Sequence, residues 1–127
     1  WGRIINVSGL AARRSGNPVG SVRNVSVSAL TKNLADELGP HGINVTVVHP
    51  GATRTERTAK MVTARATERG ISEEAAEQQL AVGNSIHHLV DAREVAYVVT
   101  FLASPKSIAI NGDTIAAGGG LGNAIHY

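Results

Sequence analysis

One stretch, residues 20–38, constrains the fold of this chain more than any other. It reads GSVRNVSVSALTKNLADEL, stops at Gly39-Pro40, and precedes the β-branched run INVTVV. At about 100° per residue, it carries apolar side chains on two nearly opposite sides of a helix. One row is Val22, Val25 and Ala29, and the other is Val27, Leu30, Leu34 and Leu38. Because such a helix has to bury both rows, we expect a sheet behind it and a second surface in front, such as another copy of the chain.

An apolar run lies on each side of this helix in the sequence. Residues 3–8 (RIINVS) show no alternation of apolar and polar positions, which is typical of a strand buried on both faces. Residues 9–19 contain two glycines and a proline and predict a loop. Residues 43–49 predict the second strand. Two parallel strands joined by a helix form a βαβ unit, so the sequence predicts an α/β fold with helices on both faces of a parallel sheet.

The rest of the chain predicts three helices and a last strand. Residues 53–69 are poor in large apolar side chains and predict a marginal helix or a mobile flap. Ser72 can cap a helix that runs to about residue 82, and Asp91 with Glu94 has the spacing of a capping box. That capping box begins a helix that ends near residue 104. Residues 108–117 predict the last strand, broken by Asn111-Gly112, and no linker divides the chain into two domains.

Composition excludes several classes of function. The chain has 127 residues, a net charge of +2 and interspersed acids and bases, so nothing indicates a nucleic-acid surface. There is no cysteine, no visible signal peptide and no apolar run of roughly 18–20 residues, so we expect a cytoplasmic protein with no membrane contact. Adjacent histidines such as His87 and His88 cannot easily face one ion, and we expect no metal site. The chain begins at Trp1 inside an apparent strand, so we expect a fragment of a longer protein.

Three segments are expected to meet at one edge of the sheet. In open α/β sheets, ligands bind outside the carboxyl ends of the strands. Ser8-Gly9 follows the first strand, residues 50–55 follow the second, and residues 118–120 follow the last. The sequence therefore predicts the site at this edge.

These runs, taken together, resemble the second half of a short-chain dehydrogenase/reductase. The segments that carry the resemblance are GRIINVSG, ALTKNLADELGPHGINV, VVHPGATRT, REVAYVVTFLASP, INGD and GGG, in that order. The resemblance implies a Rossmann-type doubly wound parallel sheet, of which residues 1–127 supply the C-terminal part of a single domain. It also implies NAD or NADP as cofactor, hydride transfer between a small-molecule carbonyl and an alcohol, and a homodimer or homotetramer built through the helix Gly20 to Leu38.

The resemblance assigns a cofactor-binding corner to residues 50–55. In the family, Pro50-Gly51 closes over the nicotinamide, and Thr55 hydrogen-bonds that end of the cofactor. Thr53 is a nearby alternative. Thr55 also fits the start of a helix, so the two interpretations of this residue stay open. The segment from residue 58 to residue 83 corresponds to the part of the family fold that covers the substrate.

The catalytic positions of the family are where this chain departs. The family's Tyr-x-x-x-Lys pair falls on Gly20 and Asn24, and its catalytic serine falls on Gly9. Ser8 and Asn24 remain as catalytic candidates, and Asn24 can also bind a ribose hydroxyl. Each has an ordinary alternative, because Ser8 can be a hydrogen-bonding residue at a strand end and Asn24 can lie on a helix surface.

Two charged residues near the predicted site, Arg14 and Arg23, are candidates for phosphate or substrate contact.

The sequence supports two main hypotheses of function. The first hypothesis is an NAD(P)-dependent oxidoreductase with a non-standard or lost proton relay. The alternative is a catalytically inactive nucleotide-binding or oligomer-scaffold protein. A small unrelated α/β binding domain is a third reading. The sequence predicts neither the substrate nor the choice between NAD and NADP.

Overall fold

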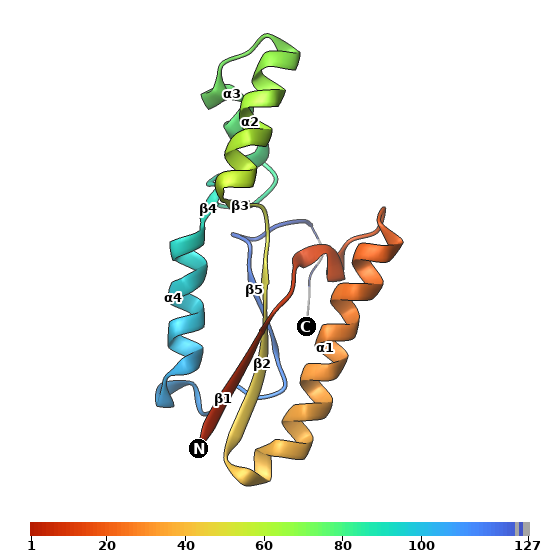
Figure 1. Ribbon diagram of the computed structural model, residues 1–127, viewed down its shortest axis with the longest axis vertical. Coiled ribbons are helices and arrows are strands. Elements are labelled where there is room, and N and C mark those ends of the chain that lie inside the picture. Colours follow the sequence, from red (N-terminus) through yellow and green to blue (C-terminus); the bar gives the residue numbers. More distant parts are fainter. Residues whose placement is uncertain (124, 126–127) are drawn as a thin grey trace.

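The central sheet has three parallel strands. A computed structural model describes residues 1–123 and 125, in which β1 (Gly2–Val7), β2 (Ile43–Pro50) and β5 (Thr114–Ala117) pair in the order β1-β2-β5. The helix α1 (Pro18–Leu38) covers one face of this sheet, and α4 (Ala92–Ala103) covers the other (Figure 1). The predicted α/β class, with helices on both faces of a parallel sheet, is confirmed.

The centre of the sheet is β2, as its sequence requires. Val45, Val47 and Val48 are fully buried, and β1 pairs along the whole of residues 43–48. By contrast, Ile4 and Val7 of β1 remain 37% and 61% exposed. A parallel strand is normally buried on both faces, so β1 is the under-covered edge of this sheet.

The long helix α1 packs on β2 through a narrow and partly polar face. Its buried residues are Gly20, Asn24, Thr31 and Ala35. Asn6 of β1 donates its side-chain N–H to Thr31 Oγ1 at 2.9 Å, which joins helix and sheet directly. Val22 and Val25 are 69% and 49% exposed. The sheet predicted behind the helix is therefore present, and the row Val22, Val25 and Ala29 faces away from it.

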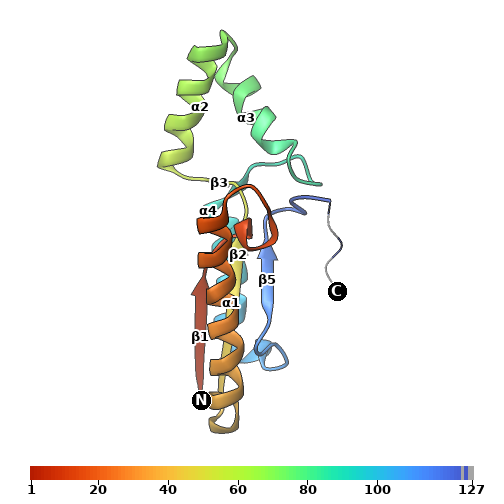
Figure 2. The same ribbon diagram turned by 90° about the vertical axis from the view of Figure 1, so that its right-hand side faces the viewer.

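Two helices form a separate hairpin beyond the carboxyl edge of the sheet. They are α2 (Glu56–Arg69) and α3 (Glu73–Ala81), and they diverge from the rest of the chain in both views (Figures 1 and 2). A small core of Val62, Ala66 and Ala76 joins them. The short strands β3 (Thr53–Arg54) and β4 (Val90–Asp91) pair at the base of the hairpin.

Three local predictions are wrong. The segment 9–19 is not all loop, because residues 10–13 form a 3₁₀ helix and α1 already begins at Pro18. Residues 53–54 are a strand, and the helix starts at Glu56. The last strand starts at Thr114 and not at residue 108, because Asn111 bends the chain against β2: its Oδ1 accepts the N–H of Val45 at 2.7 Å. The remaining 3₁₀ helices are η2 (Gly39–His41) and η3 (Pro105–Ser107).

The predicted caps are confirmed. Ser72 Oγ accepts the N–H of Ala75 at the start of α3, and Asp91 with Glu94 forms the capping box of α4. Within the part of the chain that the structure describes, no helix combines the length and apolar character that crossing a membrane requires.

Candidate active site

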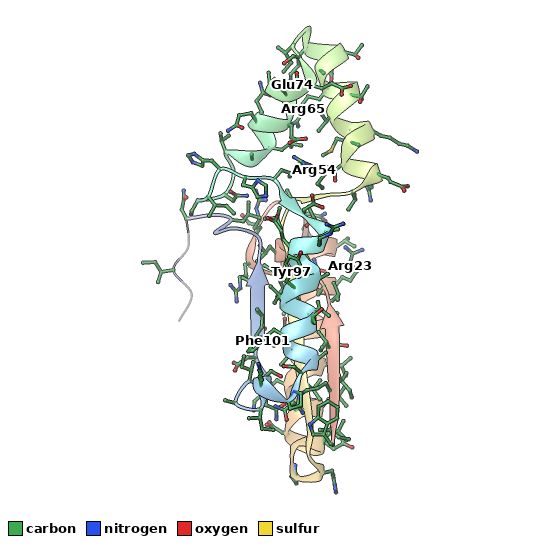
Figure 3. The ribbon with its side chains drawn as sticks, turned by 90° about the vertical axis from the view of Figure 1, so that its left-hand side faces the viewer. Arg23, Arg54, Arg65, Glu74, Tyr97 and Phe101 are labelled. Atoms are coloured by element: carbon green, nitrogen blue, oxygen red, sulfur yellow. The ribbon has the colours of Figure 1, made fainter. Side chains whose placement is uncertain are left out.

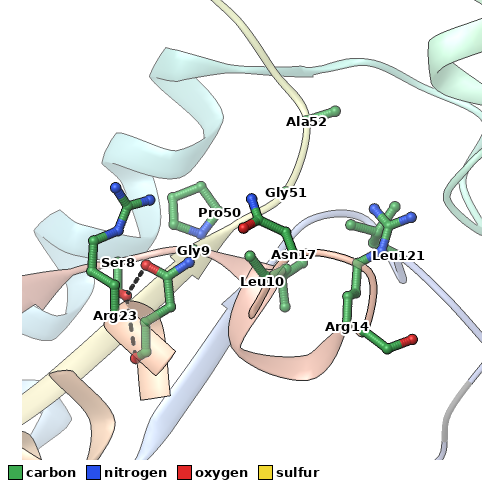
Figure 4. A pocket seen from close by; sticks show the side chains of 13 residues that line it. Ser8, Gly9, Leu10, Arg14, Asn17, Arg23, Pro50, Gly51, Ala52 and Leu121 are labelled. Atoms are coloured by element: carbon green, nitrogen blue, oxygen red, sulfur yellow. Dashed lines mark hydrogen bonds between the residues drawn. The ribbon is translucent and has the colours of Figure 1, made fainter. Parts of the chain in front are cut away.

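A pocket of about 560 Å³ lies at the carboxyl ends of β1 and β2 (Figure 4). Its walls come from the end of β1 and the loop after it, from the first turns of α1, and from the segment after β2. The lining residues are Ser8, Gly9, Leu10, Ala11, Arg14, Ser15, Asn17, Arg23, Asn24, Pro50, Gly51, Ala52 and Leu121. Pockets of this size are usual for small-molecule ligands, and this edge of a parallel sheet is where such ligands bind.

Ser8 and Asn24 form a hydrogen-bonded pair in this pocket. Ser8 Oγ donates to Asn24 Oδ1 at 3.0 Å, which leaves the Nδ2 group of the amide as a donor. Asn24 is only 7% exposed, and among the described residues its Nδ2 has no hydrogen-bond partner. Nδ2 is nevertheless accessible to solvent. A nearly buried amide therefore offers a free N–H donor to the pocket.

His49 holds the end of β1 in place from below the pocket. Its side chain is fully buried in β2, its Nδ1 accepts the N–H of Gly9 at 3.0 Å, and its Nε2 lies 3.0 Å from Ser28 Oγ on α1. Because Nδ1 accepts, the proton of the neutral ring is on Nε2 and is donated to Ser28. Burial lowers the pKa of His49, the charge of Arg13 lowers it further, and the Gly9 hydrogen bond partly opposes them. The neutral ring thus connects β1, β2 and α1.

The start of α1 is closed by an asparagine cap. Asn17 Oδ1 accepts the N–H of Gly20 at 3.0 Å, and Pro18 occupies the first helical position. A Cβ atom at Gly20 would lie 2.9 Å from Asn17 Nδ2. A larger side chain at position 20 therefore requires the cap to move.

Glycines let two backbones meet at the floor of the pocket. A Cβ at Gly51 would lie 3.0 Å from the Cα of Gly118, and one at Gly118 would lie 2.4 Å from Leu10 Cδ1. The segments predicted to meet at this edge, after β1, β2 and β5, are thus in contact here.

The sequence-predicted site residues divide into two groups. Ser8, Asn24, Pro50 and Gly51 line the pocket. Thr53 and Thr55 do not: Thr53 Oγ1 donates to the carbonyl oxygen of Gly51, and Thr55 is the N-cap of α2, where its Oγ1 accepts the N–H of Thr58.

The sequence places His49 beside the site, as the residue before Pro50, but does not indicate its hydrogen bonds, and it did not predict Asn17 as a helix cap. Asn17 followed by Pro18 carries a recognisable helix-start signal, and would have placed the cap beside the pocket. His49 is a single titratable residue in an otherwise apolar strand, but no local pattern indicates its partners.

Tyr97 lies on α4, on the other face of the sheet from α1, and is 65% exposed (Figure 3). Across residues 1–123 and 125, no group of three His, Asp or Glu side chains is placed to bind a metal ion.

Comparisons with known proteins agree with this geometry. The model of the family described as Enoyl-(Acyl carrier protein) reductase matches residues 1–122. The NADPH-dependent reductase BacG of Bacillus subtilis is 34% identical over 122 residues, covering 94% of this chain and 47% of its own. The 3-oxoacyl-[acyl-carrier-protein] reductase FabG of Vibrio cholerae is 32% identical over 122 residues, covering 94% and 46%.

A solved structure gives the same result. YwfH, described as an NADPH dependent reductase involved in Bacilysin biosynthesis, superimposes with a TM-score of 0.84 at 31% identity and covers 98% of this chain and 48% of its own. The chain therefore spans about half the length of the relatives it matches.

Proposed function

Because the chain belongs to the short-chain dehydrogenase/reductase family, we propose that the whole protein is an NAD- or NADP-dependent oxidoreductase. It transfers hydride between a small-molecule carbonyl and an alcohol, and residues 1–127 form the C-terminal part of its single Rossmann-type domain. The names of its relatives include NADPH-dependent reductases. A chain without cysteine is also suited to the cytoplasm, where we place the protein.

The observation that carries this proposal is the donor that Asn24 offers to the pocket. Its Nδ2 is free while Ser8 holds its Oδ1, so the amide is oriented to bind an acceptor such as a ribose hydroxyl. Pro50 and Gly51 form the neighbouring wall, where the close approach of Gly51 to Gly118 keeps the surface free of side chains. These residues fit the nicotinamide end of the cofactor, which when bound supplies the hydride. Thr53 and Thr55 lie outside the lining of this pocket, and their hydroxyl groups already bond to the Gly51 carbonyl oxygen and to the Thr58 N–H.

The proton relay is the unusual part of this site. An asparagine amide and a serine hydroxyl donate hydrogen bonds but are poor acids, and an arginine stays protonated. Asn24 therefore acts as a catalytic residue by orienting and polarising a carbonyl through its free Nδ2, and Ser8, whose O–H is donated to Asn24 Oδ1, fixes the orientation of that amide. The proton itself comes from another source, such as water. Loss of a positioned general acid costs typically about 10²–10⁴-fold in rate, so we expect slow turnover.

A specific observation favours the alternative, a nucleotide-binding or scaffold protein without turnover. Asn17 Nδ2 occupies the space that a side chain at position 20 would need, so the first turn of α1 is built around a glycine. The exposed row Val22, Val25 and Ala29 would then be the functional surface. In either case, we propose that this row packs against the same row of a second copy in a homodimer or homotetramer.

Restoring the family's residues tests the proposal. In the longest natural form of the protein, Gly20→Tyr and Asn24→Lys are combined with Asn17→Ala, which clears the space beside position 20. NADPH oxidation is then followed with a panel of ketones and aldehydes. A slow wild type and a variant faster by about 10²–10⁴-fold support an oxidoreductase that lacks only its acid. If both proteins leave NADPH and NADH unoxidised, the alternative stands. Asn17→Ala alone is the control for the loss of the cap.

A further inference from the structure

The walls of the pocket carry positive charge without compensation. Arg14 and Arg23 are its charged lining residues, and no Asp or Glu lines it. The sequence around them is equally one-sided, because residues 1–35 contain Arg3, Arg13, Arg14, Arg23 and Lys32 and no acidic residue at all.

Neither arginine is committed to another role. Among the residues that the structure describes, the ion pairs are Lys32–Asp36, Arg54–Glu77 and His88–Glu94. The hydrogen bonds that involve Arg14 and Arg23 use their backbone groups, and both exposed guanidinium groups have no partner within residues 1–123 and 125. Figure 4 shows the two side chains on either side of the pocket, with Asn17 between them.

A third group in the same pocket also needs an acceptor. Asn24 is 93% buried, since 7% of it is exposed, and its Nδ2 faces the pocket without a partner. Because this amide N–H is accessible from the pocket and has no partner among the described residues, a ligand with oxygen acceptors can pair with it. Guanidinium groups pair best with carboxylate and phosphate, which accept two parallel hydrogen bonds.

The phosphates of a dinucleotide cofactor are not expected beside these arginines. In this fold, the pyrophosphate binds at the Gly-rich first βα turn. The charge at this edge is therefore available to the substrate.

From these observations we infer that the substrate carries an anionic oxygen group, a carboxylate or a phosphate, in addition to its carbonyl or alcohol, and that Arg14 and Arg23 bind it. This inference rests on the proposed oxidoreductase function and adds the substrate class and the specificity residues.

The test compares charged and neutral substrates that are otherwise alike. With the longest natural form of the protein and NADPH or NADH, kcat/KM is measured for pyruvate, acetoacetate and levulinate and for their methyl esters. These acids place the carboxylate at three distances from the carbonyl. Dihydroxyacetone phosphate and dihydroxyacetone form a second pair, which distinguishes phosphate from carboxylate. We expect the wild type to prefer the charged member of at least one pair by about tenfold or more, which corresponds to one charge-assisted hydrogen bond.

Variants then locate the preference. Arg23→Gln and Arg14→Gln are each expected to lower the ratio of charged to neutral kcat/KM by about tenfold through a higher KM for the anion. Arg23→Lys keeps the charge but loses the planar fork, and is expected to recover part of the ratio. Arg93→Gln, on an exposed residue of α4 outside the pocket, removes the same charge and should leave the ratio unchanged.

The result also separates this inference from the proposed function. Equal turnover of acids and esters, or a ratio that Arg14→Gln and Arg23→Gln leave intact, would overturn the inference while the oxidoreductase stands. If no compound is turned over, the proposed function fails, and calorimetry with levulinate and inorganic phosphate decides the inference. Millimolar binding that is weakened by Arg23→Gln but not by Arg93→Gln supports an anion site, and no binding of either probe overturns it.

Discussion

The buried imidazole of His49 allows the sharpest test of how this site is held together. The ring is fully buried and makes two hydrogen bonds of 3.0 Å, one from the Gly9 N–H and one to Ser28 Oγ. His49→Phe keeps a ring of similar shape and removes both bonds. The Gly9 N–H and Ser28 Oγ that lose their partner are only partly buried, so each lost hydrogen bond costs about 0.5–1.5 kcal/mol, and we expect the free energy of unfolding to fall by about 1–3 kcal/mol.

A double-mutant cycle separates this effect from simple overpacking. Ser28→Ala alone leaves the Nε2 proton without an acceptor, while the combination with His49→Phe removes both members of that pair. We therefore expect the double variant to lose less stability than the sum of the two single variants, by about 0.5–3 kcal/mol. Urea unfolding at pH 8, followed by circular dichroism on the longest natural form, measures all four proteins. Strict additivity, or a loss below about 0.5 kcal/mol in His49→Phe, would refute the bridging role, because that is the size of an ordinary surface substitution.

The same residue predicts how stability depends on pH. Its pKa is lowered in the folded protein from an ordinary value of 6.5, so below pH 6.5 the unfolded chain binds a proton that the folded chain resists. Stability from this group is thus fully present above pH 6.5 and is lost as the pH falls toward the folded pKa. We expect the free energy of unfolding of His49→Phe to fall less steeply than that of the wild type between pH 7.5 and pH 5. Parallel curves for the two proteins would contradict this assignment.

Two further substitutions test the packing of the site and the proposed assembly. Gly118→Ala places a Cβ 2.4 Å from Leu10 Cδ1 and 3.1 Å from the backbone Cα and N of Gly51, which cannot move aside by a rotamer change. We therefore expect thermal unfolding to show a loss of about 1–3 kcal/mol, with Gly83→Ala, where the nearest atom is at 3.4 Å, as the control. Equal losses of stability in the two variants would contradict close packing of Gly118 against Gly51 and Leu10. Val25→Glu on the exposed row of α1 is expected to reduce the sedimentation coefficient to that of a smaller assembly. Ala64→Glu, on an exposed residue of α2, is the control and should leave the coefficient unchanged. If Val25→Glu also leaves it unchanged, α1 does not form the interface between copies.

Local sequence signals were sufficient to predict the main strand and several helix ends of this protein. The buried run of residues 43–49 and the stop at Gly39-Pro40 predicted β2 and the end of α1, since both depend on neighbours in the chain. Ser72 and the pair Asp91–Glu94 predicted two helix starts for the same reason. Helix caps and turns depend on a few residues that are adjacent in the sequence, so they can be predicted from it.

Long-range contacts account for what the sequence did not predict. The sequence predicted a break at Asn111-Gly112 but not its cause: Asn111 Oδ1 accepts the N–H of Val45, 66 residues away, and pairing with β2 begins only at Thr114. Ser8 and Asn24 were separate candidates, and their hydrogen bond depends on how α1 crosses the end of β1. The bridge through His49 joins three elements and has no local pattern at all.

Cofactor binding is the most direct test of the central claim, that this edge of the sheet belongs to an NAD(P)-dependent oxidoreductase. The measurement is a fluorescence titration of NADH and NADPH against the longest natural form of the protein, with Asn24→Ala as the site variant and Arg93→Gln as the control. We expect saturable binding of at least one cofactor, weaker in Asn24→Ala and unchanged in Arg93→Gln. No binding of either cofactor at millimolar concentration would contradict it, and would leave a dehydrogenase scaffold used for another purpose.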